Sequence, residues 1–478
     1  MAADQRKAVM EAKKHIGDVS DTLVSVSRKV WEFAEVGLQE NRSAAYQIEV
    51  LEAEGFRATQ GTGGMPSAFV AEWGSGGPVI GFLGEYDALM GLSQKAVPVK
   101  EPACAGAPGH GCGHNLLGAA ALGSAIALKR YLQSQNLPGT VRYYGCPAEE
   151  TLIGKVFMAR DGVFDDLDAA ITWHPAATNT VQLGSSNGVN SAKFTFYGKT
   201  AHAAGDPHNG RSALDAVELM NIGANYLREH VIPDARLHYV ITEGGGQPNV
   251  VPARAQVWYY VRAPHRNQVE EIYARLVDVA KGASLMTGTT FDIEFLAGCY
   301  DVLPNDALAM LCLEVFKEMG APAWTPEDLA FAEELAKSLD RKQVIEALKA
   351  HGAPKELFTQ VVNTTVIDPI DKGKVMAGST DVGDVSWIVP TVQVSAACWP
   401  IGSPGHSWQI AASSGHGFGE KGMLRSAEVM AAAAIILHSD PAILEKAKDE
   451  FRERLAGDTY KTPLPEGLEP PLSQFKKA

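Results

Sequence analysis

The sequence predicts an α/β protein whose larger domain holds a mostly parallel sheet and is interrupted by a small ferredoxin-like α+β domain. Three observations predict this architecture. The chain has 478 residues, more than a single compact core holds. Strand and helix patterns alternate in its first part, and a strand-helix-strand-strand-helix-strand order follows. We place the first part of the larger domain at residues 1–186, the small domain at 187–299 and the second part at 300–478.

In the first part, apolar residues at steps of three and four predict amphipathic helices, and short runs of β-branched and aromatic residues predict strands. The predicted elements are helices at 22–36 and 43–54, strands at 68–71, 79–83 and 140–144, and an alanine-rich helix at 116–132 with the composition of a buried crossover. Strands that alternate with helices favour parallel pairing. Ligands of parallel sheets bind at the carboxyl ends of the strands, so we expect the site there.

The pattern changes near Ser186, where residues 191–197 alternate as a half-buried antiparallel strand does. The predicted elements that follow are a helix at 213–230, strands at 238–242 and 255–262, a helix at 267–286 and a strand at 289–296. The small domain is expected to be an insertion, because candidate site residues occur on both sides of it. Residues 326–358 are charged and helical in pattern, which predicts a peripheral helical insertion about this range.

Composition points to a small-molecule substrate. The net charge of -14 argues against nucleic acid or an anionic membrane as a partner, since both favour clustered lysine and arginine. No apolar run reaches the roughly 18 to 20 residues of a membrane span, and no signal-peptide core opens the chain. Six scattered cysteines do not resemble a disulfide framework. We therefore expect a cytoplasmic protein with reduced thiols.

Chemically active side chains gather in residues 109–115 (Gly-His-Gly-Cys-Gly-His-Asn), 147–150 and 173–175. Together with His406 they offer enough ligands for two adjacent divalent ions that share one bridging group. The candidate ligands are Cys112, His114, Glu150, His174 and His406. Zinc and manganese both suit this set. Cys112 is the best candidate for the bridge, because a thiolate between two divalent cations is deprotonated at neutral pH.

Structural interpretations of these residues remain open. A Cys-x-His pattern alone is weak, Asn115 could cap a helix and His110 could be a loop residue. The adjacent Glu149 and Glu150 could form a solvated turn, but two carboxylates near a core are costly unless a cation or substrate pairs with them. One carboxylate must bind metal while its neighbour stays free to accept a proton. We assign Glu149 as the general base and acid and Glu150 as the ligand.

The chain resembles the two-metal amidohydrolases related to carboxypeptidase G, aminoacylase and the indole-acetyl-amino-acid hydrolases. The resemblance covers nearly the full length and is carried by residues 31–40, Gly-Glu-Tyr-Asp-Ala-Leu at 84–89, Cys-Gly-His at 112–114, Glu149-Glu150, His174, Gly-Lys-Thr-Ala-His-Ala at 198–203, and His406. It implies two zinc or manganese ions held by the five candidate ligands, with Glu149 as the base. It also implies that the small domain is a lid that forms a homodimer, or that pairs with a homologous partner of similar fold.

The resemblance also gives the lid a part in catalysis. It implies that His202 reaches an active site, that of the partner subunit, and donates a hydrogen bond to the tetrahedral oxyanion. Asn249 would contact the substrate amide or carboxylate. Arg262 could pair with a carboxylate through two hydrogen bonds, although it ends a predicted strand and could equally be structural.

The sequence departs from the family in a few places. Glu85 stands where several relatives have a metal-binding histidine, so we expect Glu85 and Asp87 to orient ligands rather than bind metal. Asp381 and Asp384 fall where relatives often carry an acidic pair, and their role is open, as is that of the insertion at 326–358.

These residues favour a metal-dependent amidohydrolase that cleaves an N-acyl or N-aroyl amino acid. A dipeptidase or aminoacylase using the same site is the alternative enzyme. A non-catalytic metal-binding scaffold is the alternative from another class, and Glu149 argues against it, because binding alone does not need an unligated carboxylate beside the metal.

Overall fold

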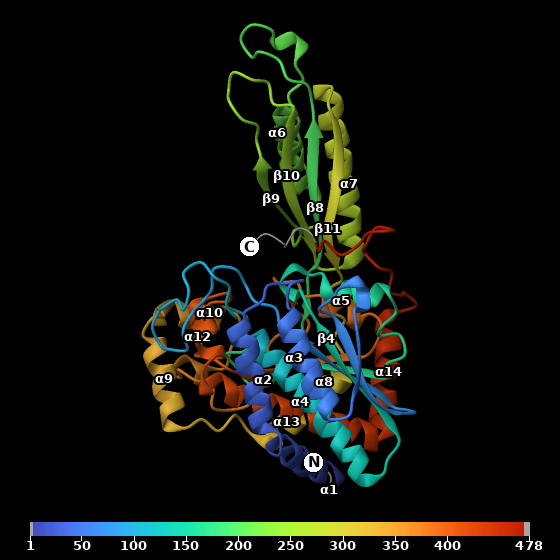
Figure 1. Ribbon diagram of the computed structural model, residues 1–478, viewed down its shortest axis with the longest axis vertical. Helices are drawn as coiled ribbons and strands as arrows, with labels where there is room; N and C mark the ends of the chain where they lie inside the picture. Colours follow the sequence, from blue (N-terminus) through green and yellow to red (C-terminus); the bar gives the residue numbers. More distant parts are fainter. Residues whose placement is uncertain (1–2, 473–478) are drawn as a thin grey trace.

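A seven-stranded sheet forms the centre of the larger domain in the computed structural model, which describes residues 3–472 (Figure 1). Its order is β1 (Arg57–Gln60), β2 (Phe69–Ser75), β4 (Gly139–Cys146), β3 (Val79–Glu85), β5 (Ala169–Ala176), β13 (Thr391–Ala397) and β6 (Thr180–Val181). The central strands β4, β3, β5 and β13 are parallel. The pairings at both edges are antiparallel. The predicted α/β class is confirmed, with the parallel strands confined to the middle of the sheet.

The sheet separates two hydrophobic cores, because successive side chains of its strands point to opposite faces. Phe82 and Tyr143 belong to the larger core, and the adjacent Leu83 and Tyr144 to the smaller one. The larger core is covered by α1 (Ala3–Gly17), α2 (Ser20–Phe33), α3 (Asn41–Ala53), α4 (His114–Gln135), α8 (Asp306–Met319), α13 (Gly417–Ser439) and α14 (Pro441–Leu455). The smaller core is covered by α5 (Gly154–Arg160) and α11 (Val382–Ser386).

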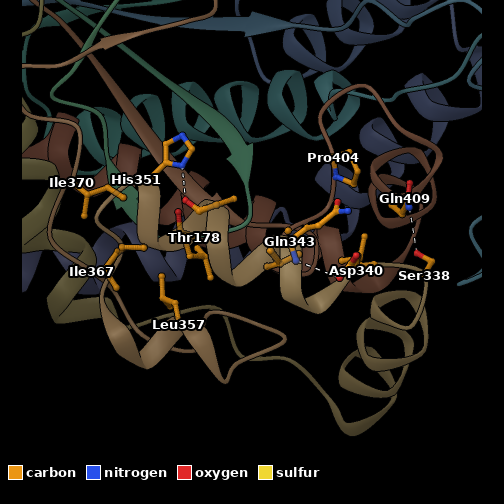
Figure 2. Close-up of a pocket in the computed structure, with 16 residues that line it drawn as sticks. Thr178, Ser338, Asp340, Gln343, His351, Leu357, Ile367, Ile370, Pro404 and Gln409 are labelled. Atoms are coloured by element: carbon orange, nitrogen blue, oxygen red, sulfur yellow. Dashed lines mark hydrogen bonds between the residues drawn. The ribbon is translucent and has the colours of Figure 1, made fainter.

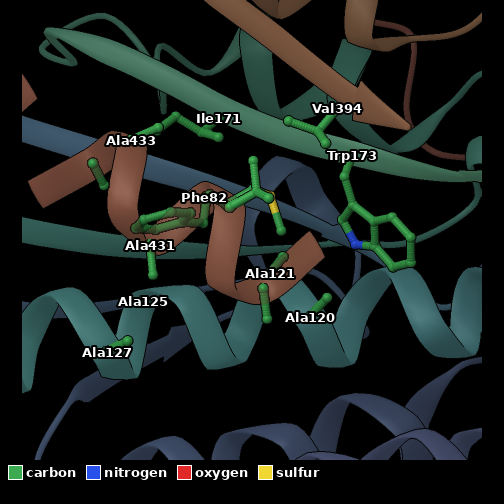
Figure 3. Close-up of a cluster of buried hydrophobic side chains, with 14 of the residues drawn as sticks. Phe82, Ala120, Ala121, Ala125, Ala127, Ile171, Trp173, Val394, Ala431 and Ala433 are labelled. Atoms are coloured by element: carbon green, nitrogen blue, oxygen red, sulfur yellow. The ribbon is translucent and has the colours of Figure 1, made fainter. Parts of the chain in front are cut away.

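Alanines let α4 and α13 pack closely on the sheet. Figure 3 shows Ala120 and Ala121 of α4 and Ala431 of α13 beside Phe82 and Ile171 of the strands. Small side chains keep the backbones close, so the start of α4 is held firmly at the carboxyl edge of the sheet. Among the described residues no single helix has the length and apolarity to cross a membrane; only α13 and α14 taken together, bent by 99°, meet that criterion.

The small domain is a four-stranded antiparallel sheet with two helices on one face, and it projects away from the larger domain (Figure 1). Its elements are β8 (Gly188–Tyr197), α6 (Ala213–Leu227), β9 (Arg236–Glu243), β10 (Arg254–Ala263), α7 (Arg266–Thr287) and β11 (Thr290–Cys299). The strand order β11-β8-β10-β9 and the βαββαβ chain order are those of a ferredoxin-like fold. The predicted topology of this domain is therefore confirmed.

Residues 326–358 form two helices and a short 3₁₀ turn beside the larger domain. These are α9 (Pro326–Ala336), α10 (Arg341–Ala350) and η5 (Lys355–Phe358). Thr325 caps α9 by accepting from the backbone N–H of Asp328, and the Asp328 carboxylate accepts from the N–H of Thr325. Further short elements are β7 (Ser185–Ser186), β12 (Val375–Met376) and α12 (Trp408–Ser414). Val344 and Leu357 of this segment form a small core with Ile401, which precedes the His406 loop.

Candidate active site

The carboxyl ends of the four central parallel strands bring the candidate residues together. β3 ends at Glu85, and β4 leads into the 3₁₀ turn η2 (Glu149–Thr151). β5 carries His174, and β13 leads into the loop that holds His406. α4 begins at His114. Residues from distant parts of the chain thus meet at one edge of the sheet, as expected for this type of fold.

Two ligand groups share the Cys112 thiol. The ligand atoms of Cys112, His114 and His174 all lie within 4.8 Å of one another, and so do those of Cys112, Glu150 and His406. Cys112 Sγ is 3.5 Å from His174 Nε2, and His406 Nε2 is 3.2 Å from Glu150 Oε2. His114 Nε2 and Glu150 Oε1 are buried without a hydrogen-bond partner. Buried polar atoms are rarely left unpaired, so these two atoms suit cations.

Neighbouring groups orient the imidazoles. His114 Nδ1 lies 2.8 Å from Asp87 Oδ1, and Asp87 Oδ2 accepts the backbone N–H of Glu150 at 2.9 Å. His174 Nδ1 lies 2.7 Å from the carbonyl oxygen of Pro175 and donates to it. These bonds place the protons on Nδ1 and leave both Nε2 atoms free to face Cys112. Asp87 therefore holds a ligand histidine and the Glu149-Glu150 turn at the same time.

Gly113 lets the chain bend between the thiol and the imidazole. Its φ is 80°, and an added Cβ would lie 3.1 Å from Trp399 and 3.2 Å from Pro175. A side chain is thus disfavoured both by the left-handed conformation and by space. The Cys-Gly-His pattern is explained by this tight turn, which brings Cys112 and His114 to one point.

The electrostatics of the site favour bound cations. Burial opposes ionisation of Cys112, but His114 and His174 outweigh it and hold the pKa of the thiol well below its usual value. Burial and the neighbouring thiolate raise the pKa of Glu150 to about 6. Hydrogen bonds to Cys112 and Glu150 raise the pKa of His406 to about 10. Anionic groups so crowded are stable at neutral pH when positive charge lies between them.

Glu149 lies beside these groups without belonging to either. Its Oε2 is 3.8 Å from His114 Nε2, and it forms a third close set with Glu85 and His114. Burial, followed by the nearby Glu85 carboxylate, raises the pKa of Glu149 well above its usual value. A carboxyl group with a raised pKa accepts and returns a proton more readily, which suits a general base.

Two buried groups of the site were not anticipated from the sequence. Lys155, in the first turn of α5, forms ion pairs with Glu85 and Asp381. Glu40 accepts the backbone N–H of Ala148 at 2.8 Å, and burial raises its pKa to about 8. A single lysine or glutamate gives no local sequence signal that distinguishes a buried ion pair from a solvated side chain.

Asp384 lies apart from the ligand groups. Its carboxylate accepts from the hydroxyl of Tyr460 at 2.9 Å and from the backbone N–H of Tyr300 at 3.2 Å. Burial raises its pKa to about 7. In the structure it fastens the C-terminal segment to the start of the second part of the larger domain, whereas Asp381 faces Lys155.

The lid loops that carry His202 and Asn249 lie at the end of the lid remote from the larger domain (Figure 1). The two residues are neighbours, because the N–H of Ala203 donates to the carbonyl oxygen of Asn249 at 3.0 Å. His202 Nδ1 accepts the backbone N–H groups of Ala204 and Gly205. Its proton is therefore on Nε2, which is free to donate. Within one described chain, no contact joins His202 to the ligand groups.

Arg262 does not lie with Asn249. It is near the other end of β10, opposite Val189 and Arg236, and its guanidinium stands over the ring of Tyr260 at 5.4 Å. Its Nε is buried and has no hydrogen-bond partner. The two lid residues assigned to substrate binding are thus at opposite ends of the lid sheet.

A cavity of about 570 Å³ adjoins the loop before His406 (Figure 2). Its wall is formed by α10, by the residues that flank this helix, by Gln409 of α12, and by the loops that hold Thr178, Ile367 and Gly402. Its lining includes Thr178, Val344, Gly402 and Pro404. Thr178 follows the strand of His174, and Gly402 and Pro404 precede His406, so the cavity borders segments that carry two candidate ligands.

Comparisons with known proteins agree with this geometry. Residues 185–285 match the peptidase dimerisation domain of the M20 family. The chain is 42% identical to one of the subunits of p-aminobenzoyl-glutamate hydrolase from Escherichia coli (strain K12), over 93% of this chain and 95% of that protein. It is 29% identical to the Xaa-Arg dipeptidase of Mus musculus, over 95% of this chain and 94% of that protein.

Solved structures share the fold. An aminobenzoyl-glutamate utilization protein from Klebsiella pneumoniae has a TM-score of 0.58 at 18% identity, covering 88% of this chain and 97% of that one. A Bacillus subtilis protein described as a dinuclear metal binding peptidase from the M20 family has a TM-score of 0.56 at 18% identity, covering 88% and 99%. The chain therefore belongs to the M20 family of metal-dependent peptidases and amidohydrolases.

Proposed function

We propose that this enzyme hydrolyses the amide bond between an acyl or aroyl group and an amino acid, with p-aminobenzoyl-glutamate as the model substrate. The observation that carries the proposal is the pair of ligand groups that share Cys112 beside an unshared Glu149. The relative that is 42% identical over nearly the whole chain supports the substrate class.

The residues fit two divalent ions, zinc or manganese. Cys112 would bind both ions, His114 and His174 the first, and Glu150 and His406 the second. When bound, the ions supply Lewis acidity that polarises the substrate carbonyl and lowers the pKa of water. The chain supplies the rest of the chemistry. Glu149 accepts the proton of the attacking water and delivers it to the leaving amine nitrogen.

We assign the oxyanion contact to His202 of a partner subunit, because its proton is on Nε2 and its loop lies far from its own ligand groups. Asn249, on the adjacent loop, would reach the substrate amide or carboxylate of the same partner site. Arg262 lies at the opposite end of the lid sheet from Asn249, so the two residues would not contact the same part of a substrate. Its unpaired Nε remains suited to a carboxylate.

A homodimer through the lid fits the surface of β9. This strand is at the edge of the lid sheet, and Tyr239, Val240 and Ile241 on it are exposed. Ile222 and Tyr226 of α6 are exposed as well. An unpaired apolar edge strand is a surface that proteins normally cover. Pairing with a homologous chain is the alternative, since relatives include a second, different subunit of p-aminobenzoyl-glutamate hydrolase from Escherichia coli (strain K12).

Mixing two inactive variants tests the role of His202. His202→Ala subunits keep the base, and Glu149→Ala subunits keep the histidine, so one site of each hybrid dimer would be complete. With free exchange, activity should return to roughly a quarter of the wild-type value. Wild-type subunits taken through the same exchange are the control. If verified hybrid dimers stay inactive, His202 does not act across the dimer.

Helix α10 is proposed to support the His406 loop, which gives the insertion a function. Gly402 has a φ of 93°, and a Cβ there would lie 2.3 Å from Val344 Cγ2. Gly402→Ala should therefore strain or shift the loop at a cost of about 1 to 3 kcal/mol and weaken the ion held by His406. Metal analysis after dialysis measures the loss. Gly405→Ala is the matched control, because nothing lies within 4 Å of its Cβ position; equal losses in both variants would contradict the support by α10.

A hydrolysis panel tests the substrate proposal. The enzyme would be loaded with zinc or with manganese and given p-aminobenzoyl-glutamate, other N-acyl amino acids, and dipeptides that end in arginine. Preferred cleavage of N-acyl or N-aroyl amino acids supports the proposal. The dipeptidase is the second candidate, favoured by the 29% identical relative, and preferred cleavage of dipeptides would establish it instead.

A further inference from the structure

A buried lysine joins three segments next to the ligand groups. The side chain of Lys155 is fully buried. Its Nζ is 2.7 Å from Glu85 Oε1 and 2.5 Å from Asp381 Oδ1. Its backbone N–H also donates to Asp381 Oδ2 at 2.8 Å. The end of β3, the start of α5 and the residue before α11 are thus fixed to one ammonium group.

The other oxygen of Glu85 faces a candidate metal ligand. Glu85 Oε2 is 3.3 Å from His114 Nε2, the nitrogen that has no hydrogen-bond partner. Glu85, His114 and Glu149 form a set whose ligand atoms all lie within 4.8 Å of one another, close enough to hold an ion. If an ion were bound by this third set, the set would compete with the Cys112 groups for His114. It would also turn Glu149 from a base into a ligand.

We infer that Lys155 is a positioning residue that holds the Glu85 carboxylate out of metal coordination, so that His114 Nε2 binds the ion shared with Cys112 and Glu149 stays unligated. The inference rests on the proposed metal site. A permanent ammonium at 2.7 Å satisfies one oxygen of Glu85 and compensates its charge. Without that ion pair, a buried carboxylate is expected to pair with another cation, and an ion bound by His114 Nε2, which lies 3.3 Å from Glu85 Oε2, would be within its reach.

Asp381 gains a role from the same geometry. One carboxylate would leave the ammonium free to turn, whereas Asp381 binds both the Nζ and the backbone N–H of Lys155. Asp381 therefore fixes both the ammonium group and the backbone of Lys155. Burying a lysine is costly unless it is paired in this way, which argues for a function beyond filling space.

Cobalt absorption spectroscopy tests the inference, because the d–d bands of Co²⁺ report the number of ligands. Lys155→Met should allow Glu85 to bind, so the bands should weaken as the coordination number rises. Metal affinity or kcat should fall by about 10- to 100-fold, as for other residues that orient ligands. KM should change less than kcat, since Lys155 is fully buried and has no surface to offer a substrate.

A matched pair of variants separates this effect from misfolding. The double variant combines Lys155→Met with Asp381→Asn and retains Glu85. The triple variant adds Glu85→Gln and so removes the competing carboxylate. The double variant should have altered cobalt bands. The triple variant should regain the wild-type bands, because an amide is a much weaker ligand than a carboxylate. The inference would be overturned if the double and triple variants had the same spectrum, whether that spectrum was altered or wild-type. The spectra are read without substrate, so a failure of the substrate proposal would not affect the result.

Discussion

Replacing Glu149 by alanine is expected to lower kcat by about 10² to 10⁴-fold, the usual contribution of a general acid-base group. The metal content should stay at the wild-type value. The reason is the position of Glu149, which lies beside both ligand groups but belongs to neither. Its raised pKa, caused by burial and by Glu85, suits a group that must accept a proton and then return it. Metal analysis and steady-state kinetics on the same preparation measure both quantities.

Glu150→Ala is the control for the Glu149 variant, because it removes the adjacent carboxylate. Glu150 lies 3.2 Å from His406 and shares a ligand group with it and Cys112. Its loss should therefore reduce metal content as well as activity. If instead the Glu149 variant loses stoichiometric metal and the Glu150 variant retains it, the roles of the two glutamates are reversed.

The position of the candidate site in the fold could be predicted because it depends on local rules. The alternation of strands and helices indicated parallel strands, whose carboxyl ends meet at one edge. Glu150 follows such a strand and His174 lies on one, and Cys112 lies just before the helix that packs on the sheet. The ferredoxin-like order of the lid could be predicted in the same way, from the sequence of strand and helix patterns alone.

The antiparallel edges of the sheet were not predicted, although the spacing indicated them. Only residues 76–78 separate β2 from β3. A parallel connection needs a crossover of about a dozen residues, so β2 must run opposite to β3 and its neighbour β4. Attention to loop length, rather than to strand pattern alone, would have identified this.

Long-range polar contacts could not be predicted from one sequence. Lys155 and Asp381 are 226 positions apart, and no local pattern links them. The same holds for the packing of Val344 with Ile401, which joins the insertion to the His406 loop. His202 illustrates a different difficulty, since the role proposed for it requires a second chain. Such contacts depend on how elements pack, which hydrophobic periodicity does not determine.

Replacing Cys112 by serine is expected to weaken the binding of both ions together. The thiol belongs to both ligand groups. His114 and His174 hold its pKa well below the usual value, which favours the thiolate form that a ligand shared by two ions needs. A serine hydroxyl has a far higher pKa and is a harder, weaker ligand for zinc. Activity should fall by more than the loss of about 10- to 100-fold that is typical when a residue only orients a metal ligand.

The measurement for Cys112→Ser is the number of ions per chain after dialysis against a range of free metal concentrations. Cys104→Ser is the matched control, because Cys104 is also a free thiol but is exposed and belongs to neither ligand group. Simultaneous loss of two ions supports a bridging thiolate, since removal of a shared ligand weakens the binding of each ion directly. It also removes the negative charge that lets two cations lie close together. Loss of one ion with normal binding of the other would instead make Cys112 a ligand of a single metal, and the two ions would then need a different bridge.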